Sequence, residues 1–226
     1  MGRPISESEK THNLAEEFQA ELLEFFDLFS WPFSKEDRPS AKGCVIADVG
    51  TRTFSSAPAI EKNFEKIYSE VEIHGYEIDA YRRFTNFRTR ADYGHYYSKK
   101  VRKGFYHAED FRKSSRKYDI ILMLHPFVTP SAHLAWGLPL SLYDPRDLFA
   151  HCLRSLRGET GLFLLSSPRE EEYEKAVDLT LSLGFELIDE KVWRPRQNSI
   201  QKQMRLGALF KTQFAPPPRS LNLDKC

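Results

Sequence analysis

The sequence predicts an α/β fold: a doubly wound, mostly parallel sheet with helices on both faces. Short apolar runs that end in turn residues alternate along the chain with amphipathic helical patterns. The first run passes through Asp48 and Gly50 into a helix start at residues 55–58, and the next run, residues 71–78, carries Glu77 near its end. A strand, a glycine turn, a helix and an acid-tipped strand form the nucleotide-binding half of such a sheet.

Length, charge and cysteine content narrow the class of protein. The 226 residues suffice for one sizeable core, and a formal net charge of +1 gives no global argument for binding nucleic acid or an anionic membrane. Cys44, Cys152 and Cys226 are odd in number and widely spaced, which argues against a disulfide framework or a zinc knuckle. No apolar leader or membrane-spanning run is visible, so we expect a cytoplasmic protein without membrane contact.

The chain divides into three parts. Residues 1–43 hold an amphipathic helix and a linker, residues 44–214 form the α/β domain, and the proline-containing tail, residues 215–226, is not expected to pack. The helix presents an apolar stripe of Leu14, Phe18, Leu22, Phe25, Phe26 and Phe29. We expect this stripe to pack on the domain as a lid or brace, with dimerisation as the less favoured alternative; the oligomeric state is not defined by the sequence.

The later elements are predicted from apolar runs and helix caps. Further strands are expected at 104–107, 118–124, 161–165, 185–193 and 206–211. Asp144 before Pro145 starts one helix, and a capping box formed by Ser167 and Glu170 starts another. The long loop 127–143 is interpreted either as a substrate lid or as a rigid turn.

Residues 81–105 interleave cations with aromatic side chains, as grooves for single-stranded nucleic acid do. An ordinary amphipathic helix or loop with a solvated basic face is the favoured interpretation. Nucleic-acid contact through this segment is the alternative.

The order of parts resembles the class I S-adenosylmethionine-dependent methyltransferases, from about residue 44 to residue 214. The resemblance rests on Asp48-Val49-Gly50, Gly75-Tyr76-Glu77, Ala108-Glu109-Asp110 and Tyr118-Asp119-Ile120-Ile121. It implies a seven-stranded sheet whose last strand is antiparallel, and S-adenosylmethionine as cofactor. It also implies that Asp48 and Gly50 hold the amino-acid end of the cofactor, Glu77 the ribose hydroxyls, and Asp110 the region of the adenine.

Two departures from the family pattern bear on function. Arg52 and Phe54 stand where the family usually has glycines, which let the backbone approach a ligand closely. Arg52 either fills the cofactor space or pairs with the cofactor's carboxylate, and both interpretations stay open. The stretch 124–127 lacks the Asp or Asn side chain that would hold an exocyclic amine, so methylation of adenine N6 is disfavoured.

His125 follows a central strand, where it could act as a general base, although a structural histidine is the more common case. The histidines show no metal-ligand spacing, so no metal is predicted. A single glycine in the first turn argues against a dinucleotide site. We therefore expect methyl transfer from S-adenosylmethionine to an unidentified acceptor. The alternative is a noncatalytic methyltransferase-fold protein that binds a partner or nucleic acid.

Overall fold

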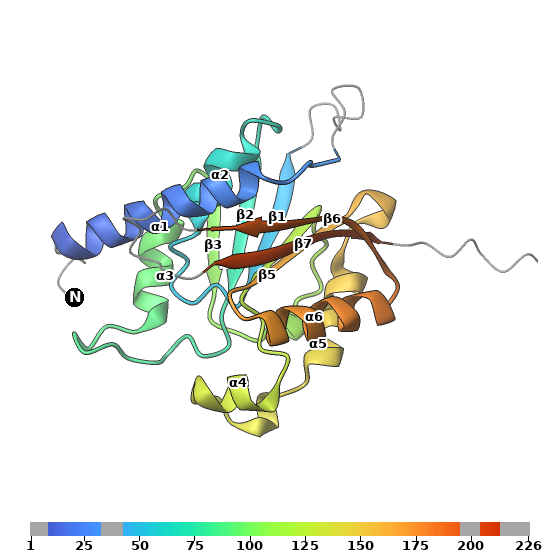
Figure 1. Cartoon of the computed structure of the whole chain (residues 1–226). Helices are drawn as coiled ribbons and strands as arrows, with labels where there is room; N and C mark the ends of the chain where they lie inside the picture. The colour runs from blue at the N-terminus through green and yellow to red at the C-terminus, as the bar shows by residue number, and fades with distance from the viewer. Residues whose placement is uncertain (1–8, 33–42, 195–203, 213–226) are drawn as a thin grey trace, which may run out of the picture.

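The computed structural model describes residues 9–32, 43–194 and 204–212, which form a seven-stranded sheet between two layers of helices (Figure 1). The strand order is β3-β2-β1-β4-β5-β7-β6. The strands are β1 (Cys44–Val49), β2 (Val71–Tyr76), β3 (Gly104–His107), β4 (Ile120–Leu124), β5 (Leu162–Ser167), β6 (Phe185–Trp193) and β7 (Arg205–Thr212). β1 to β5 are parallel, and β7 runs antiparallel to both β5 and β6. The predicted doubly wound sheet with an antiparallel last strand is confirmed.

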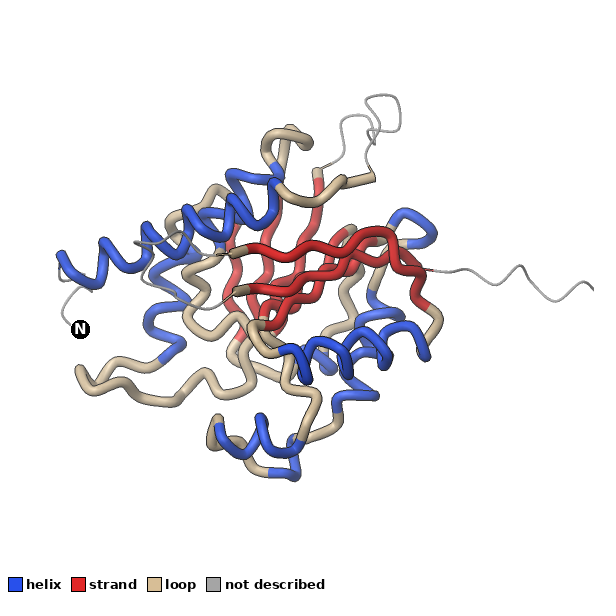
Figure 2. Tube along the Cα trace, in the orientation of Figure 1, coloured by secondary structure: helices blue, strands red, loops and turns tan. Residues whose placement is uncertain are grey.

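The helices cover the two faces of the sheet unequally (Figure 2). They are α1 (Glu9–Asp27), α2 (Ala57–Phe64), α3 (Arg90–Ser98), α4 (Pro130–Ala135), α5 (Pro145–Ser155) and α6 (Glu170–Ser182). Side chains of α1, α2 and α3 share one core cluster with the sheet, and those of α5 and α6 share the other. In β4, Ile120 and Leu122 enter the first core while Ile121 and Met123 enter the second. A strand buried on both faces reads as a continuous apolar run, which is why β4 was visible in the sequence.

The N-terminal helix packs on the domain, as the favoured interpretation of its stripe expected. Leu22, Phe25 and Phe26 of α1 are fully buried and belong to the same core as the sheet. The guanidinium of Arg205, at the start of β7, lies 5.4 Å from the centre of the Phe25 ring. The linker residues 33–42 and the tail 215–226 lie outside the described residues, so the three-part division of the chain stays a prediction.

The predicted start of α2 at residues 55–58 is confirmed, whereas the predicted start of α6 differs from the structure. α2 begins at Ala57, but the hydroxyl of Ser56 makes no capping bond and donates to Asp48 Oδ2 instead. α6 begins at Glu170 after an Arg169 N-cap, and Ser167 bonds to the backbone of Arg169, so the predicted capping box is wrong. The Ser56 hydroxyl thus bonds to the carboxylate at the end of β1 rather than to the helix, and Ser167 is still part of β5, three residues before α6 begins.

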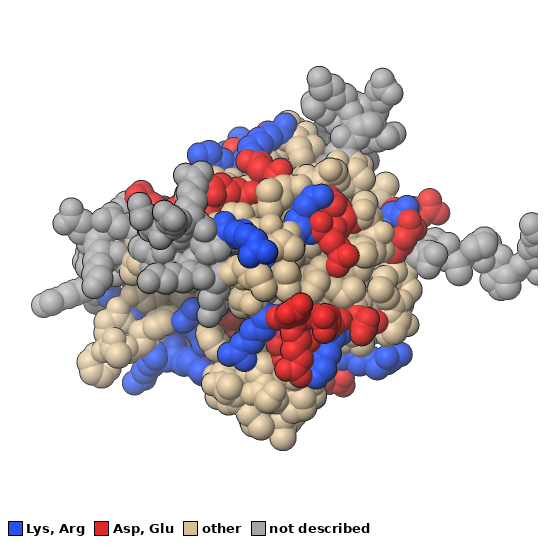
Figure 3. Space-filling view, in the orientation of Figure 1, with Lys and Arg blue, Asp and Glu red and all other residues tan. Residues whose placement is uncertain are grey.

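Charge is separated locally despite the small net charge. In the view of Figure 3, Lys and Arg side chains gather at the lower left, near the loop between β2 and α3, while acidic side chains lie over α6. In the part of the chain that the structure describes, no helix is long and apolar enough to cross a membrane.

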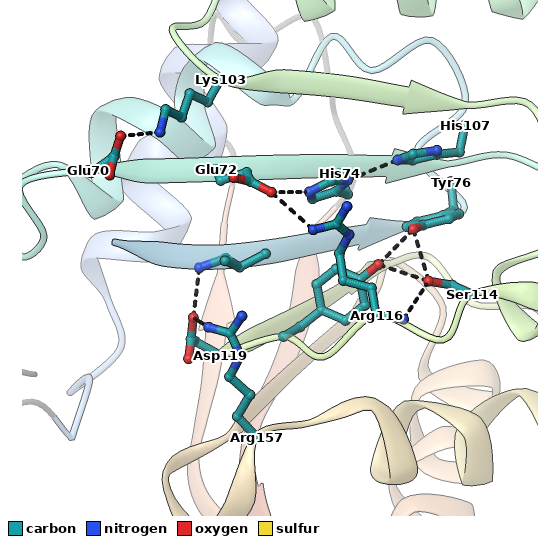
Figure 4. Close-up of polar contacts among 12 residues, drawn as sticks. Glu70, Glu72, His74, Tyr76, Lys103, His107, Ser114, Arg116, Asp119 and Arg157 are labelled. Atoms are coloured by element: carbon teal, nitrogen blue, oxygen red, sulfur yellow. Dashed lines mark hydrogen bonds and ion pairs between the residues drawn. The ribbon is translucent and has the colours of Figure 1, made fainter. Parts of the chain in front are cut away.

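A polar network lies over β1–β3 on the face of the sheet that α5 and α6 cover (Figure 4). Its members are Glu72, His74, Tyr76, His107, Ser114 and Tyr118. The connection from β3 to β4 contains only the 3-10 turn Phe111–Lys113, so α5 and α6 leave this part of the sheet partly open, and Phe105 is 45% exposed. His74 bonds to Glu72 at 2.7 Å and to His107 at 2.9 Å.

Candidate active site

A cavity of about 950 Å³ lies at the carboxyl ends of β1, β2 and β4, and all six predicted site residues line it: Asp48, Gly50, Arg52, Glu77, Asp110 and His125. In the strand order, β1 and β4 are the neighbours between which the chain changes direction. Open α/β sheets bind ligands at such a switch point. The structure therefore brings the predicted residues together, while their roles stay predictions.

Asp48, at the end of β1, is 1% exposed and keeps part of its hydrogen-bonding capacity. Thr51 Oγ1 donates to Asp48 Oδ2 at 2.6 Å and Ser56 Oγ donates to the same oxygen at 2.5 Å. Burial raises the pKa of Asp48 to about 6, although these two hydrogen bonds act in the opposite direction. Within the described residues Oδ1 takes no hydrogen bond, so this oxygen can accept one from a ligand.

The turn after β1 keeps a glycine-like backbone although two of its residues are not glycine. Gly50, Arg52 and Phe54 have φ values of 74°, 60° and 61°, all in the left-handed region. That conformation costs a residue with a side chain roughly 1–2 kcal/mol. Phe54 is fully buried, and its ring packs so closely on Gly75 that a Cβ there would lie 2.6 Å from a ring carbon. The sequence could not reveal that Arg52 and Phe54 adopt the left-handed backbone that glycine would adopt without strain.

The Arg52 side chain reaches from this turn to the loop 127–143. Its guanidinium lies 5.1 Å from the centre of the Trp136 ring, and the guanidinium of Arg90 lies 5.5 Å from the same centre. Partial burial and the charge of Arg90 lower the pKa of Arg52. Arg52 thus lines the pocket, where it can either obstruct or bind a ligand.

Glu77, directly after β2, is largely occupied by protein donors. Its Oε2 accepts from Arg52 N at 2.9 Å, and its Oε1 accepts from Asp79 N at 2.8 Å and from Arg90 Nη1 at 3.3 Å. A carboxylate offers about four acceptor positions. One position on Oε2 is therefore left for a ligand hydroxyl, whereas the resemblance implied that Glu77 holds both ribose hydroxyls. Sequence reasoning missed the partner Arg90, a cation 4% exposed at the start of α3.

Asp110 is held by its own neighbour. It caps the 3-10 turn that follows β3, and Arg112 Nη2 and Nε reach Asp110 Oδ2 at 2.6 and 3.0 Å. Burial alone would raise the pKa of Asp110, but the hydrogen bonds and charge of Arg112 outweigh burial and hold the pKa below its usual range. Asp110 therefore lines the pocket as a charged, already paired carboxylate.

His125 follows β4 with a φ of 82°, and its backbone N donates to Ser166 O at 2.7 Å. Its Nδ1 is buried and takes no hydrogen bond from the described residues. Burial, reinforced by the charges of Arg205 and Arg52, lowers the pKa of His125 to about 3. The ring is neutral at physiological pH and is a weak proton acceptor there. The general-base role stays a prediction.

The loop 127–143, which forms the other wall of the pocket, is anchored at two places. Glu172 of α6 accepts from Val128 N at 2.8 Å and also bonds to the backbone and hydroxyl of Thr129. Arg82 donates to the carbonyl oxygens of Trp136 and Gly137 at 2.5 and 3.1 Å. These anchors favour a rigid wall over a freely moving lid.

Within the described ranges no three His, Cys, Asp or Glu side chains group as metal ligands, and the predicted lack of a metal stays a prediction.

Known structures share the fold of this chain at low sequence identity. Magnesium protoporphyrin IX methyltransferase of Synechocystis PCC 6803, solved with bound S-adenosylmethionine, gives a TM-score of 0.54 at 9% identity over 94% of this chain and 87% of that chain. A protein of Pyrococcus horikoshii, provisionally named an RNA methyltransferase, gives 0.55 at 13% identity over 87% and 82%. An S-adenosylmethionine-dependent O-methyltransferase of Thermotoga maritima gives 0.52 at 13% identity over 95% and 69%.

No family model and no curated protein sequence matches the chain. At these identities the structural likeness establishes the architecture and leaves the acceptor undefined. The chain has a seven-stranded sheet with an antiparallel β7, and the solved neighbours that share its architecture are methyltransferases by their names. The chain therefore has the fold of the class I S-adenosylmethionine-dependent methyltransferases.

Proposed function

We propose that the protein is an S-adenosylmethionine-dependent methyltransferase. The observation that carries this proposal is the turn 50–54, in which Gly50, Arg52 and Phe54 have left-handed backbone conformations. The turn lies between Asp48 and Glu77, at the ends of two neighbouring parallel strands. A cavity of about 950 Å³ is at the upper end of the ~300–1,000 Å³ range of small-ligand pockets, which allows room for a cofactor and an acceptor group. The S-adenosylmethionine bound to the Synechocystis neighbour supports the choice of cofactor.

The pocket residues fit this cofactor in part. Asp48 Oδ1 would accept from the ammonium group, and the remaining position on Glu77 Oε2 would accept from one ribose hydroxyl. The bound cofactor would supply an activated methyl group on a sulfonium. The protein would position the acceptor and exclude water. Positioning alone can remove a large part of the activation barrier of a displacement reaction.

The alternative is a noncatalytic protein of the same fold. Two observations favour it: Glu77 is already paired with Arg90, and the Arg52 side chain lies in the pocket. The acceptor is likewise open. The name of the Pyrococcus horikoshii protein supports nucleic acid as one class to test.

Calorimetric titration of the full chain with S-adenosylmethionine and with its demethylated product tests the proposal. Arg52→Ala removes the guanidinium but keeps a side chain at a left-handed position, while Arg52→Gly removes both. If the guanidinium obstructs the cofactor, both variants gain affinity; if it pairs with the cofactor's carboxylate, both lose affinity. If neither the wild type nor either variant gives heat with millimolar cofactor, the noncatalytic alternative is established.

A further inference from the structure

The loop between β2 and α3 forms a small braced hairpin, residues 83–89, rather than an extended linker. Phe84 N donates to Arg88 O at 2.8 Å, which closes the hairpin across its turn. Asn86 Nδ2 donates to the hydroxyl of Tyr93 in α3 at 2.6 Å, which fixes the tip to the helix. In Figure 1 this loop projects to the lower left, beside α3 and away from the sheet.

The hairpin and the residues before it expose two aromatic rings. Phe87 is 83% exposed and Tyr81 is 74% exposed. Phe87 also has a φ of 63°, a position that glycine or asparagine occupies with less strain. The strained backbone at Phe87 therefore destabilises the fold, and the exposed ring gains no stabilisation from burial. Such a side chain points to a ligand rather than to folding.

The hairpin itself carries cations and no acids, although acids just before it pair with two of the neighbouring arginines: Asp79 with Arg82 at 2.5 Å, and Glu77 and Asp79 with Arg90. Residues 81–90 carry arginine at 82, 83, 88 and 90 and no Asp or Glu, and Arg83 is exposed. Further along the chain, Arg102 and Lys103 pair with Glu65 and Glu70. Of the cations in residues 81–105, Arg82, Arg90, Arg102 and Lys103 are thus paired with acids, while Arg83 is exposed on the hairpin beside the aromatic rings.

The hairpin begins at the wall of the pocket. Glu77 and Ile78 line the cavity, and the chain then runs directly into the exposed residues. Arg82, just before the hairpin, holds the backbone of Trp136 and Gly137 in the opposite wall. A molecule bound along the hairpin would therefore lie next to the pocket mouth.

Exposed rings beside arginines match a polymer that alternates planar bases with phosphates. Unpaired bases stack on aromatic side chains, whereas the bases of a duplex are already stacked on each other. We propose that the 83–89 hairpin, with Tyr81, binds single-stranded nucleic acid and delivers one nucleotide to the pocket as the methyl acceptor. Delivery as an acceptor rests on the proposed function, while binding by the hairpin does not.

Fluorescence anisotropy with a labelled single-stranded RNA and a DNA of the same sequence, each about 20 nucleotides, tests binding at about 50 and 200 mM salt. Phe87→Gly removes the ring and relieves the left-handed strain, so this variant keeps the fold. It should bind about 5- to 100-fold more weakly. Phe87→Trp should retain the wild-type affinity. Arg83→Ala should reduce the slope of log affinity against log salt by about one.

The matched control is the double variant Lys99→Ala/Lys100→Ala, which removes exposed cations beyond the end of α3 and should change affinity by less than about twofold. The proposal is overturned if wild type binds neither strand at low salt, or if Phe87→Gly binds like wild type. It is also overturned if the Lys99/Lys100 variant weakens binding more than Phe87→Gly, or if phosphatidylserine vesicles or duplex RNA bind more tightly than single strands. Nucleic-acid binding without any cofactor binding would remove only the proposed methyl transfer.

Discussion

Two regions of the molecule collect polar and titratable side chains, and they differ in how fully those side chains are satisfied. In the network on the open face (Figure 4), His74 uses both ring nitrogens, and the Tyr118 hydroxyl reaches Tyr76 at 2.6 Å and Ser114 at 3.2 Å. In the pocket, the His125 Nδ1 takes no partner from the described residues, and Asp48 leaves one oxygen available. Strain follows the same division, because Arg52, Phe54 and His125 have positive φ. A completed network marks structure, whereas unused capacity and strain mark a binding site.

The two regions should differ most in the unfolding free energy that is lost when one carboxylate of each is made neutral. Glu77→Gln leaves Arg90 buried with only Asp79 as a charged partner, at 3.2 Å. Breaking a buried pair usually costs 3–5 kcal/mol, and the retained partner places the expected loss at about 3 kcal/mol. Glu72→Gln keeps an oxygen for the hydrogen bond with His74 and loses only the charge that faces the half-exposed Arg116, so it should cost less than about 1 kcal/mol. Urea denaturation of both variants measures this, and equal losses would remove the distinction.

A second expectation concerns the raised pKa of Asp48, about 6, and the proposed cofactor. Only the ionised carboxylate attracts an ammonium group, so affinity should rise with pH through 6. Because apparent affinity scales with the competent fraction, the gain between pH 5 and pH 7 is about tenfold. Calorimetry at several pH values measures it. Asp48→Asn should bind weakly with no such pH dependence, and a wild-type affinity that is flat across this range would contradict the assignment.

A smaller effect is expected within the completed network. Tyr118 is fully buried, and Tyr118→Phe removes a hydroxyl while Tyr76 keeps Ser114 as a partner at 3.1 Å. The unfolding free energy should fall by about 1 kcal/mol, the usual net contribution of one hydrogen bond. The affinity for any pocket ligand should stay unchanged. A loss of binding in this variant would join the two regions into one functional unit.

The smallest expected difference is in acid sensitivity. Burial lowers the pKa of both His107 and His125, so each binds fewer protons in the folded chain than in the unfolded chain. Their contribution to stability is complete above the unfolded pKa of about 6.5 and is lost as the pH falls below it. Asp48, with a raised pKa, acts in the opposite direction. His107→Gln and His125→Gln should therefore each reduce the loss of stability between pH 7.5 and 5; an unchanged or steeper loss in both variants would show this account to be wrong.

Much of the fold was predictable because burial leaves a pattern along the chain. β1, β2 and β4 appear as apolar runs that end in turn residues, and the acids Asp48 and Glu77 mark the strand ends at the pocket. What could not be predicted depends on contacts between distant segments. Arg90 reaches Glu77 only once α3 is folded against β3, so a cation at the edge of a basic segment gave no sign of a buried ion pair.

The backbone conformation of the turn after β1 could not be predicted from the sequence either. Arg52 and Phe54 occupy left-handed positions that their side chains disfavour. The turn is held by the packing of Phe54 under Gly75 and by the hydrogen bond from Arg52 N to Glu77, both contacts with residues far along the chain. A rule based on residue types places glycine there and treats any other residue as a loss of the motif. The structure shows that Arg52 and Phe54 adopt this glycine-like conformation all the same.

The contact between the first helix and the last strand has a consequence for synthesis of the protein. Leu22, Phe25 and Phe26 of α1 share their core with Leu209 of β7, which is made about 180 residues later. At about 5–20 residues per second, the apolar stripe of α1 waits on the order of ten seconds or more on the ribosome before its docking surface is complete. During that interval Phe26 can already pack on Phe64 of α2, but Phe25 and Phe29 lack the β7 backbone at Gly207 that covers them, which makes these two rings a natural target for chaperones that bind nascent chains.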